Sequence, residues 1–313
     1  MARVVNGVTL VLSVLVLAAA LAAVVALFGD RDARFDLLSH FALVYGAVGL
    51  GGLAWALAAR RGPMVAASVL ALLASGALIR PEFVREAGPT APATATGQIK
   101  VIQINALRDN ADIGRIADWL IAQHPDIVTV TEARHDLRDL LIRRTGWKTA
   151  GSHGDLMILT PAQYVTMNRP TVSPRSKLSF VNATYAHSGG PMELVTTHLA
   201  WPTAPPVARQ HRELASLVAR LPRERMILTG DFNATPWSKG LQNLDRGLGL
   251  TRRDRDVPTY PAQVLGRAWP LPFLPIDHVY AGPGWATVKV ERGPWLGSDH
   301  YPLIVTLAPA ATP

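Results

Sequence analysis

The sequence contains no cysteine, and this absence narrows the kinds of site that the chain can hold. A chain without cysteine forms no disulfide and offers no thiolate to a zinc ion. The absence fits an exported protein and a cytosolic protein equally, so it does not decide the compartment. A metal site in this chain has to be built without thiolate ligands.

Charge is also missing from three long stretches near the N-terminus. Residues 4–28 and 63–79 contain no charged side chain, and residues 37–59 contain only His40 as a possible charge. The runs of 25, 17 and 23 residues match the roughly 17–25 residues that cross the hydrocarbon core of a bilayer as a helix. We therefore predict three transmembrane helices within residues 1–86.

Two other interpretations of these runs are open. A cleaved signal peptide would begin with a basic residue such as Arg3, but its apolar region usually spans only about 7–15 residues. Burial in a soluble fold is an alternative for the third and shortest run. Three charge-free segments in succession favour the membrane.

The arginines are nearly balanced across the predicted membrane. The short "RRG" loop at Arg60 and Arg61 has no acidic residue and gives the strongest positive-inside signal. With three spans, it predicts a multi-pass protein of the cell (inner) membrane in which everything after Ile79 lies outside the cytoplasm. The Ala, Pro and Thr residues of segment 87–97 predict a flexible or extended spacer before the next domain.

The remaining chain, residues 98–313, is basic. It carries 24 Lys and Arg against 18 Asp and Glu, which is +6 of the total net charge of +8. A basic domain favours anionic partners, such as nucleic acid, phospholipid headgroups or phosphorylated metabolites. No dense basic run selects one of them.

Strand-like and helix-like segments alternate through residues 98–313, which predicts an α/β domain. Several of the expected strands end or begin on a polar residue: Asn105, Glu132, His198, Asp231 with Asn233, and Asp277 follow apolar runs, while Asp299 and His300 precede the last one. The interior of a buried strand is apolar, but its end can present a polar group to a cleft. These strand ends therefore predict one site.

Each of these residues also has an ordinary structural explanation. An acid at a strand end often forms a turn or caps a helix, and His198 and His278 could each be a hydrogen-bonded histidine of the core. The combination is more informative than its members, because carboxylates and carboxamides are the ligands that Mg²⁺ or Mn²⁺ prefers. The set therefore predicts a divalent-metal site.

The stretch "ILTGDFNATP" at residues 227–236 shows the pattern most clearly. Side chains alternate along a strand, so Asp231 and Asn233 are expected on one face while Phe232 anchors the strand in the core. Gly230 allows backbone or substrate to approach closely. We expect Pro236 to help end the strand.

The motifs "QIN", "TVTE", "TTHL", "TGDFN", "IDHV" and "SDH", in this order, closely resemble the endonuclease/exonuclease/phosphatase superfamily, which includes nucleases, sphingomyelinases and inositol polyphosphate phosphatases. The resemblance covers essentially all of residues 98–313. It implies an α/β fold with a four-layer sandwich of two packed mixed β-sheets flanked by helices. It also implies a Mg²⁺- or Mn²⁺-dependent hydrolase of phosphoester bonds.

The resemblance further implies roles for the metal-binding side of the site. Glu132 would be the principal metal ligand, with Asn105 beside it. Asp299 would lie near the metal as a second ligand. Thr131 stands where many relatives carry Gln, and "ALR" follows Asn105 where nucleases often have an acid, which argues against abasic-site endonuclease activity.

The catalytic roles implied by the resemblance fall on five residues. Asp231 would orient or deprotonate the attacking water, and Asn233 would hold the same water or the phosphate. His300, polarised by Asp277, would stabilise or protonate the phosphoryl oxygens. His198 would contact the phosphate from another side.

The sequence thus supports a membrane-anchored phosphoesterase facing outward, with the lipid bilayer as a partner and a lipid-linked phosphate as substrate. A membrane-tethered nuclease acting on DNA or RNA is the main alternative, because the basic domain could follow a phosphate backbone. A non-catalytic binding module is a third hypothesis. The intact set of Glu132, Asp231 and His300 argues against it.

Overall fold

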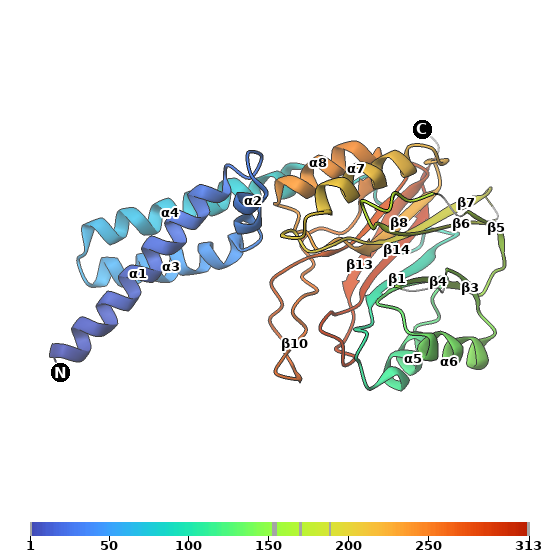
Figure 1. Ribbon diagram of the computed structural model, residues 1–313, viewed down its shortest axis with the longest axis horizontal. Coiled ribbons are helices and arrows are strands. Elements are labelled where there is room, and N and C mark those ends of the chain that lie inside the picture. The colour runs from blue at the N-terminus through green and yellow to red at the C-terminus, as the bar shows by residue number, and fades with distance from the viewer. Residues whose placement is uncertain (1, 152–154, 169–170, 188, 312–313) are drawn as a thin grey trace. The chain divides into compact units, whose positions relative to one another are not determined.

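The computed structural model describes residues 2–151, 155–168, 171–187 and 189–311. The chain divides into two compact units, which are described separately (Figure 1). The first unit comprises the chain up to Arg85 together with Thr235–Asn243. The second unit comprises Glu86–Ala234 and the chain from Leu244 onward.

Helices form most of the first unit: α1 (Ala2–Ala26), α2 (Ala33–Ser39), α3 (Ala42–Ala58) and α4 (Gly62–Val84). Residues 7–26 of α1 and the whole of α4 are long and apolar enough to cross a membrane. A third span exists if α2 and α3, which meet at an angle of 56°, count as one broken span. The second predicted span is therefore not one continuous helix, and the unit has two or three candidate spans.

Small residues lie where these helices touch. A Cβ atom added to Gly52 of α3 would lie 2.4 Å from Cγ2 of Val16 in α1, so only glycine fits there. Ala23 is fully buried, whereas Leu21 and Leu73 are about two-thirds exposed. Small residues between helices and large apolar residues on the outside are typical of helices surrounded by lipid.

The segment Thr235–Asn243 packs within this first unit. Nδ1 of His40, at the break between α2 and α3, lies 3.1 Å from the backbone nitrogen of Thr235 and accepts its hydrogen bond. The carboxylate of Asp36 accepts hydrogen bonds of 2.6 and 2.8 Å from the first two amides of α8 (Lys239–Leu248). An anion at a helix N-terminus pairs with the free amides and with the helix dipole.

Two six-stranded mixed sheets form the centre of the second unit. The first has the strand order β13 (Trp285–Arg292), β14 (Leu303–Pro309), β1 (Ile99–Asn105), β2 (Ile127–Thr131), β4 (Leu156–Thr160) and β3 (Lys148–Ala150). The second has the order β5 (Tyr164–Asn168), β6 (Ser179–Tyr185), β7 (Met192–His198), β8 (Met226–Asp231), β12 (Asp277–Ala281) and β9 (Thr251–Arg252). A separate hairpin pairs β10 (Gln263–Val264) with β11 (Arg267–Ala268).

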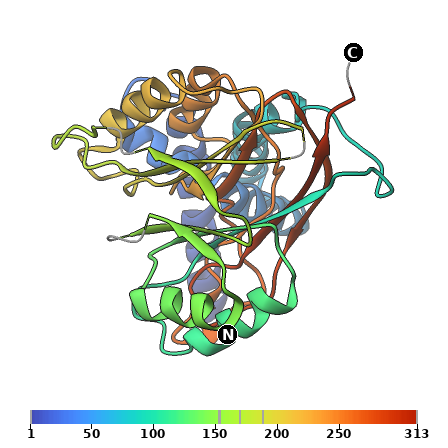
Figure 2. The same ribbon diagram turned by 90° about the vertical axis from the view of Figure 1, so that its right-hand side faces the viewer.

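Helices cover the outer faces of both sheets. α5 (Ile113–Ala122) and α6 (His135–Thr145) lie on the first sheet, and α7 (Val207–Val218) lies on the second (Figures 1 and 2). The layers therefore run helix, sheet, sheet, helix. This arrangement confirms the predicted four-layer α/β sandwich.

Apolar side chains on both faces of the first sheet hold the layers together. Val101 of β1 points into the core between the sheets, where it joins Leu194 and Val279 of the second sheet. The next residue, Ile102, points the other way and packs with Leu120 of α5. A strand buried on both faces needs this continuous apolar sequence, because neighbouring side chains alternate between the two layers.

Residues 87–97, the predicted spacer, belong to the second unit and include a turn in which the amide of Ala95 donates to the carbonyl of Pro92. Thr90 forms a parallel bridge with Thr287 of β13, whose amide donates a 2.8 Å hydrogen bond to the carbonyl of Pro89. The segment before β1 is therefore held on the edge of the first sheet.

Strand register brings the predicted polar residues to one end of the two sheets. In the parallel pair β1 and β2, Asn105 lies opposite Thr131, and Glu132 follows directly. In the parallel pair β7 and β8, His198 lies opposite Asp231. The antiparallel pair β8 and β12 places Asp277 opposite Asp231.

Candidate active site

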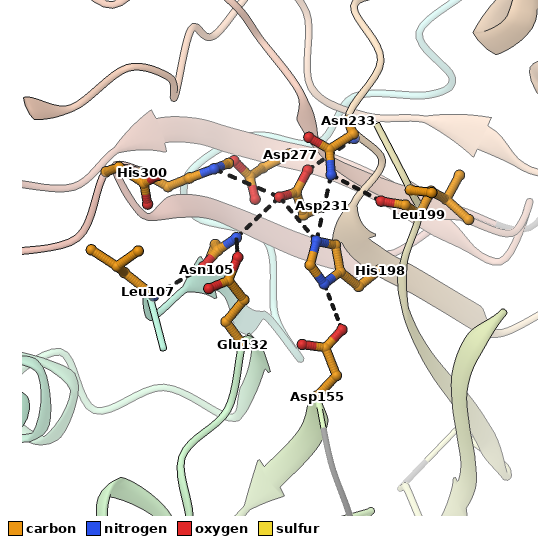
Figure 3. Close-up of polar contacts among 12 residues, drawn as sticks. Asn105, Leu107, Glu132, Asp155, His198, Leu199, Asp231, Asn233, Asp277 and His300 are labelled. Carbon is orange, nitrogen blue, oxygen red and sulfur yellow. Dashed lines mark hydrogen bonds and ion pairs between the residues drawn. The ribbon is translucent and has the colours of Figure 1, made fainter. Parts of the chain in front are cut away.

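The residues predicted from strand ends come together around one cavity of about 430 Å³ (Figure 3). Seven of the eight line this cavity: Asn105, Glu132, His198, Asp231, Asn233, Asp299 and His300. The eighth, Asp277, is hydrogen-bonded to His300. Residues that are far apart in the sequence thus form one polar cluster.

Asp231, at the end of β8, is the centre of this cluster. Its side chain is only 1% exposed, and its Oδ2 lies 3.1 Å from Nδ2 of Asn105 and 3.6 Å from Nε2 of both His198 and His300. Burial raises the pKa of this carboxyl, and the neighbouring His300 opposes the rise without cancelling it. A carboxylate with a raised pKa is suited to accept a proton.

His300 is oriented by the carboxylate behind it. Its Nδ1 lies 2.7 Å from Oδ2 of Asp277, and its Nε2 points toward Asp231. Burial alone would lower the pKa of His300, but Asp277, Asp231 and Asp299 raise it to about 10. The ring is therefore a proton donor at neutral pH.

His198, at the end of β7, is paired in the same way with a residue that the strand-end pattern did not select. Its Nδ1 lies 2.5 Å from Oδ2 of Asp155. Burial opposes protonation, but the hydrogen bond that the ring donates to Asp155 and the charge of Asp231 raise the pKa of His198 to about 9. Two protonated imidazoles thus flank one carboxylate.

The sheet topology explains why Asp155 was missed. Asp155 precedes β4, whereas most of the selected residues follow a strand. β4 runs antiparallel to β2, so Leu156 lies opposite Thr131, and the start of β4 reaches the edge where β2 ends. The sequence did contain a signal for Asp155, because this acid stands directly before the apolar run "LMILT". Asp299, which was selected, also precedes a strand.

Asn233 reaches the cavity by a route that differs from the predicted one. β8 ends at Asp231, and Asn233 lies beyond it with a φ of +50°, in the left-handed region. Its amide donates to Oδ1 of Asp231, and its side chain donates to the carbonyl of Leu199. Phe232 is fully buried as expected, so a tight turn, not continued strand alternation, places the carboxamide beside the carboxylate.

The residues assigned to metal binding offer hard oxygen ligands. Glu132 and Asp299 bring two carboxylates to the cavity, and both oxygens of Glu132 are held: Oε1 by Nδ2 of Asn105 at 3.2 Å and Oε2 by the amide of Arg108 at 2.9 Å. With Asp155 and Asp231, four carboxylates line the cavity. This set fits a divalent cation, because like charges held together favour a cation and Mg²⁺ requires few protein carboxylates.

A second group within the cluster also meets the spacing of a metal site. Ligand atoms of Asp231, Asp277 and His300 all lie within 4.8 Å of one another, and all three residues are buried. Asp277 and Nδ1 of His300 are already hydrogen-bonded to each other. The cluster thus has possible ligands for a cation both in this group and on the Glu132 side.

The second histidine of "IDHV", His278, does not line the cavity. Its ring is fully buried, with Nδ1 2.7 Å from Oδ2 of Asp254 and Nε2 2.9 Å from the carbonyl oxygen of Ala234. His278 is thus a hydrogen-bonded histidine of the core, which is one of the two alternatives that the sequence left open. His198, for which the same alternative was open, lies in the cavity.

Comparison with known proteins agrees with this geometry. The model of the Endonuclease/Exonuclease/phosphatase family matches residues 100–300, well over half of the chain. The chain belongs to this family. Members of the endonuclease/exonuclease/phosphatase family are hydrolases that act on phosphoester bonds.

Solved structures share the fold of this family member at low sequence identity. A family protein from Bacteroides vulgatus has a TM-score of 0.57 with 16% identity, over 69% of this chain and 100% of its own. One from Beutenbergia cavernae has a TM-score of 0.55 with 18% identity, over 69% and 72%. TDP2 from D. rerio, complexed with a single strand DNA product, has a TM-score of 0.54 with 16% identity, over 67% and 99%. Among curated proteins, no sequence matches this chain significantly.

Proposed function

We propose that the protein is a membrane-anchored, Mg²⁺- or Mn²⁺-dependent phosphoesterase that hydrolyses phosphodiester, phosphomonoester or diphosphate bonds outside the cytoplasm. The observation that carries this proposal is the buried carboxylate of Asp231, which lies 3.6 Å from each of two histidines that are paired with other carboxylates. A base between two proton donors, beside oxygen ligands for a cation, is what attack of water on a phosphate requires.

Each polar side chain has a task in this reaction. Asp231 takes a proton from the attacking water, and its raised pKa favours that transfer. His300 donates a hydrogen bond or a proton to the phosphoryl oxygens. His198 and Asn233, whose side chains lie 3.4 Å apart, hold the phosphate from the other side.

The metal would be held by Glu132, Asn105 and Asp299, and when bound it supplies Lewis-acid stabilisation of the charge that spreads over the non-bridging oxygens. The side-chain amide of Asn105 donates to both Glu132 and Asp231. This amide therefore keeps the two carboxylates in place for their separate tasks.

The cavity wall favours a substrate with both an anionic and an apolar part. Among the described residues that line it, Lys177 is the only Lys or Arg, and Leu199, Trp201 and Pro206 add an apolar side. Tethering to a bilayer raises the effective concentration of lipid-linked substrates at the site. A lipid-linked phosphate or diphosphate is therefore our leading substrate class.

A nuclease is the second candidate. The net charge of +6 on residues 98–313 favours a polyanion, and TDP2, whose fold is similar, was solved with a single strand DNA product. A non-catalytic binding module is less well supported, because the two histidine–carboxylate pairs and the Asp231 carboxylate are all present.

A substrate panel tests these alternatives. The full chain in detergent would be offered plasmid DNA, a chromogenic phosphodiester, a phosphomonoester and a polyprenyl diphosphate, each with Mg²⁺ or with chelator. We expect metal-dependent release from the diphosphate. Plasmid cleavage that is lost in His300→Ala would instead support the nuclease, and no release from any substrate would support the binding module.

The orientation is tested separately with a reporter fused after Pro313. We expect activity from a reporter that functions only outside the cytoplasm. Activity only from a cytoplasmic reporter would overturn the outward orientation.

A further inference from the structure

A buried histidine and its carboxylate partner lie behind the turn that follows β8, and the pair does not line the cavity. His278 is fully buried, and Asp254, its partner, is 1% exposed. Nδ1 of the ring lies 2.7 Å from Oδ2 of Asp254, and Nε2 lies 2.9 Å from the carbonyl oxygen of Ala234. None of the roles assigned above uses this pair.

The chemistry of the Ala234 carbonyl fixes the direction of the hydrogen bond to the ring. A carbonyl oxygen only accepts hydrogen bonds. Nε2 of His278 therefore donates to the carbonyl of Ala234, while Nδ1 faces Oδ2 of Asp254, an oxygen that also lies 3.8 Å from the guanidinium of Arg252. The second oxygen of Asp254 accepts the amide of Val279 at 2.8 Å, which fixes the carboxylate in turn.

The carbonyl that His278 holds belongs to the turn that carries Asn233. On the cavity side, Asn233 is held by Oδ1 of Asp231 and by the carbonyl of Leu199, at 2.9 Å each. Its φ of +50° is uncommon for a residue with a side chain. On the far side, His278 binds the carbonyl of Ala234, the residue that follows Asn233.

We propose that His278, supported by Asp254, is a positioning residue that holds the Ala234 carbonyl and thereby keeps the carboxamide of Asn233 in its catalytic orientation. The ring also packs against Phe232, with 5.5 Å between centroids, so its own position is fixed by the core. His278 acts through the turn and contacts no reacting atom. The inference rests on the proposed function, because it assumes that Asn233 contacts the phosphate.

Two isosteric substitutions separate this role from a merely structural one. Gln at position 278 places its amide nitrogen near the Nε2 position and keeps the donor to Ala234, whereas Asn places its nitrogen near Nδ1 and keeps only the donor to Asp254. We expect His278→Asn to lower kcat by about tenfold to a hundredfold, with little change in KM. His278→Gln should keep most of the wild-type kcat.

The matched control is His211 of α7, whose Nε2 has no hydrogen-bond partner among the described residues. His211→Gln and His211→Asn should differ little from each other. Equal kcat for His278→Asn and His278→Gln, at equal melting temperature, would overturn the inference.

A double mutant then tests the route through Asn233. If His278 acts through that side chain, adding His278→Asn to Asn233→Ala should lower kcat by less than about twofold, because the two changes remove one interaction. Full additivity would contradict the inference.

A nitrogen NMR spectrum of the full chain provides a test that does not depend on turnover. A proton on Nε2 of His278 supports the inference, and an unprotonated Nε2 overturns it. Absence of any phosphoester hydrolysis by the wild type, with Nε2 protonated, would instead contradict the proposed function alone.

Discussion

Asp231 illustrates how single side chains define this site. A carboxylate that is 1% exposed would be costly without partners, and here it has Asn105, Asn233 and two histidines around it. Each histidine is held by a further carboxylate on its other nitrogen. Carboxylates and imidazoles thus alternate in the order Asp155, His198, Asp231, His300 and Asp277, so each histidine lies between two carboxylates.

The Asp155 carboxylate allows a prediction for the pH dependence of activity. In the wild type, the pKa of His198 is about 9, and the hydrogen bond with Asp155 is the largest cause of its rise. Removing that charge in Asp155→Asn should lower the pKa of His198 toward its ordinary value near 6.5. Because His198 acts in its protonated form, the alkaline limb of kcat/KM should move to lower pH, while the acid limb stays.

The measurement is kcat/KM between pH 5 and 10 for both proteins. Asp118→Asn, which removes an exposed acid paired with Arg144, is the control and should leave the profile unchanged. An unshifted alkaline limb in Asp155→Asn would show that the pair does not set the charge of His198.

At the scale of elements, strand ends were predictable because a strand has a strong local pattern. The apolar runs indicate where β1, β2, β7 and β8 end, and the site residues of these strands follow from those ends. Asp277 differs, because it follows an apolar run in the sequence but is the first residue of β12. Asp155 was missed because its place depends on a neighbour that runs antiparallel. The left-handed turn at Asn233 was missed because alternation along β8 was assumed to continue past Asp231.

The pairing of β7 with β8 depends on Gly230. A Cβ atom there would lie 2.0 Å from the carbonyl oxygen of Thr197, which is backbone and cannot turn aside. This is the close approach that a glycine in this strand predicts. We predict that Gly230→Ala lowers the free energy of unfolding by about 1–3 kcal/mol through overpacking, and lowers activity because it separates His198 from Asp231.

Thermal unfolding and hydrolysis rates of the full chain check this prediction. Gly114→Ala near the start of α5 is the matched control, because its added Cβ would meet only Asp112 at 3.9 Å. Wild-type stability in Gly230→Ala would contradict the close packing of the two strands.

Side chains of helix α7 hold the segment that carries Lys177, a residue that lines the cavity. Nε2 of Gln210 donates to the carbonyl of Lys177 at 3.2 Å while its Oε1 accepts the amide of Ala200 at 2.8 Å, and Glu213 accepts the amide of Ser173 at 2.6 Å. We predict that Lys177→Ala raises KM for an anionic substrate about tenfold, from the loss of a charged hydrogen bond of about 1.5 kcal/mol, with little change in kcat.

Steady-state kinetics on the preferred substrate of the panel test the role of this lysine. Lys148→Ala, at an exposed lysine of β3 that does not line the cavity, serves as the comparison. The same KM in both variants would show that Lys177 does not contribute to substrate binding.

At the scale of the whole molecule, the sequence predicted an apolar N-terminal region and an α/β domain, and both are present. The break between α2 and α3 was not predictable from composition, because residues 37–59 contain no charged side chain except a possible charge on His40. Its partners lie about two hundred residues away, in Thr235–Asn243, where His40 and Asp36 bind backbone amides. Contacts between such distant segments leave no local pattern in either one.

The central claim is that the chain is a metal-dependent hydrolase whose base is Asp231. The most direct test measures hydrolysis by the full chain on the preferred substrate of the panel, with Mg²⁺, with chelator, and with Mg²⁺ restored, for the wild type and for Asp231→Asn. Chelation should abolish activity, and restored Mg²⁺ should recover it. Asp231→Asn should lower the rate by about 10²–10⁴-fold at an unchanged melting temperature. Activity that survives the chelator, or full activity in Asp231→Asn, would contradict this account.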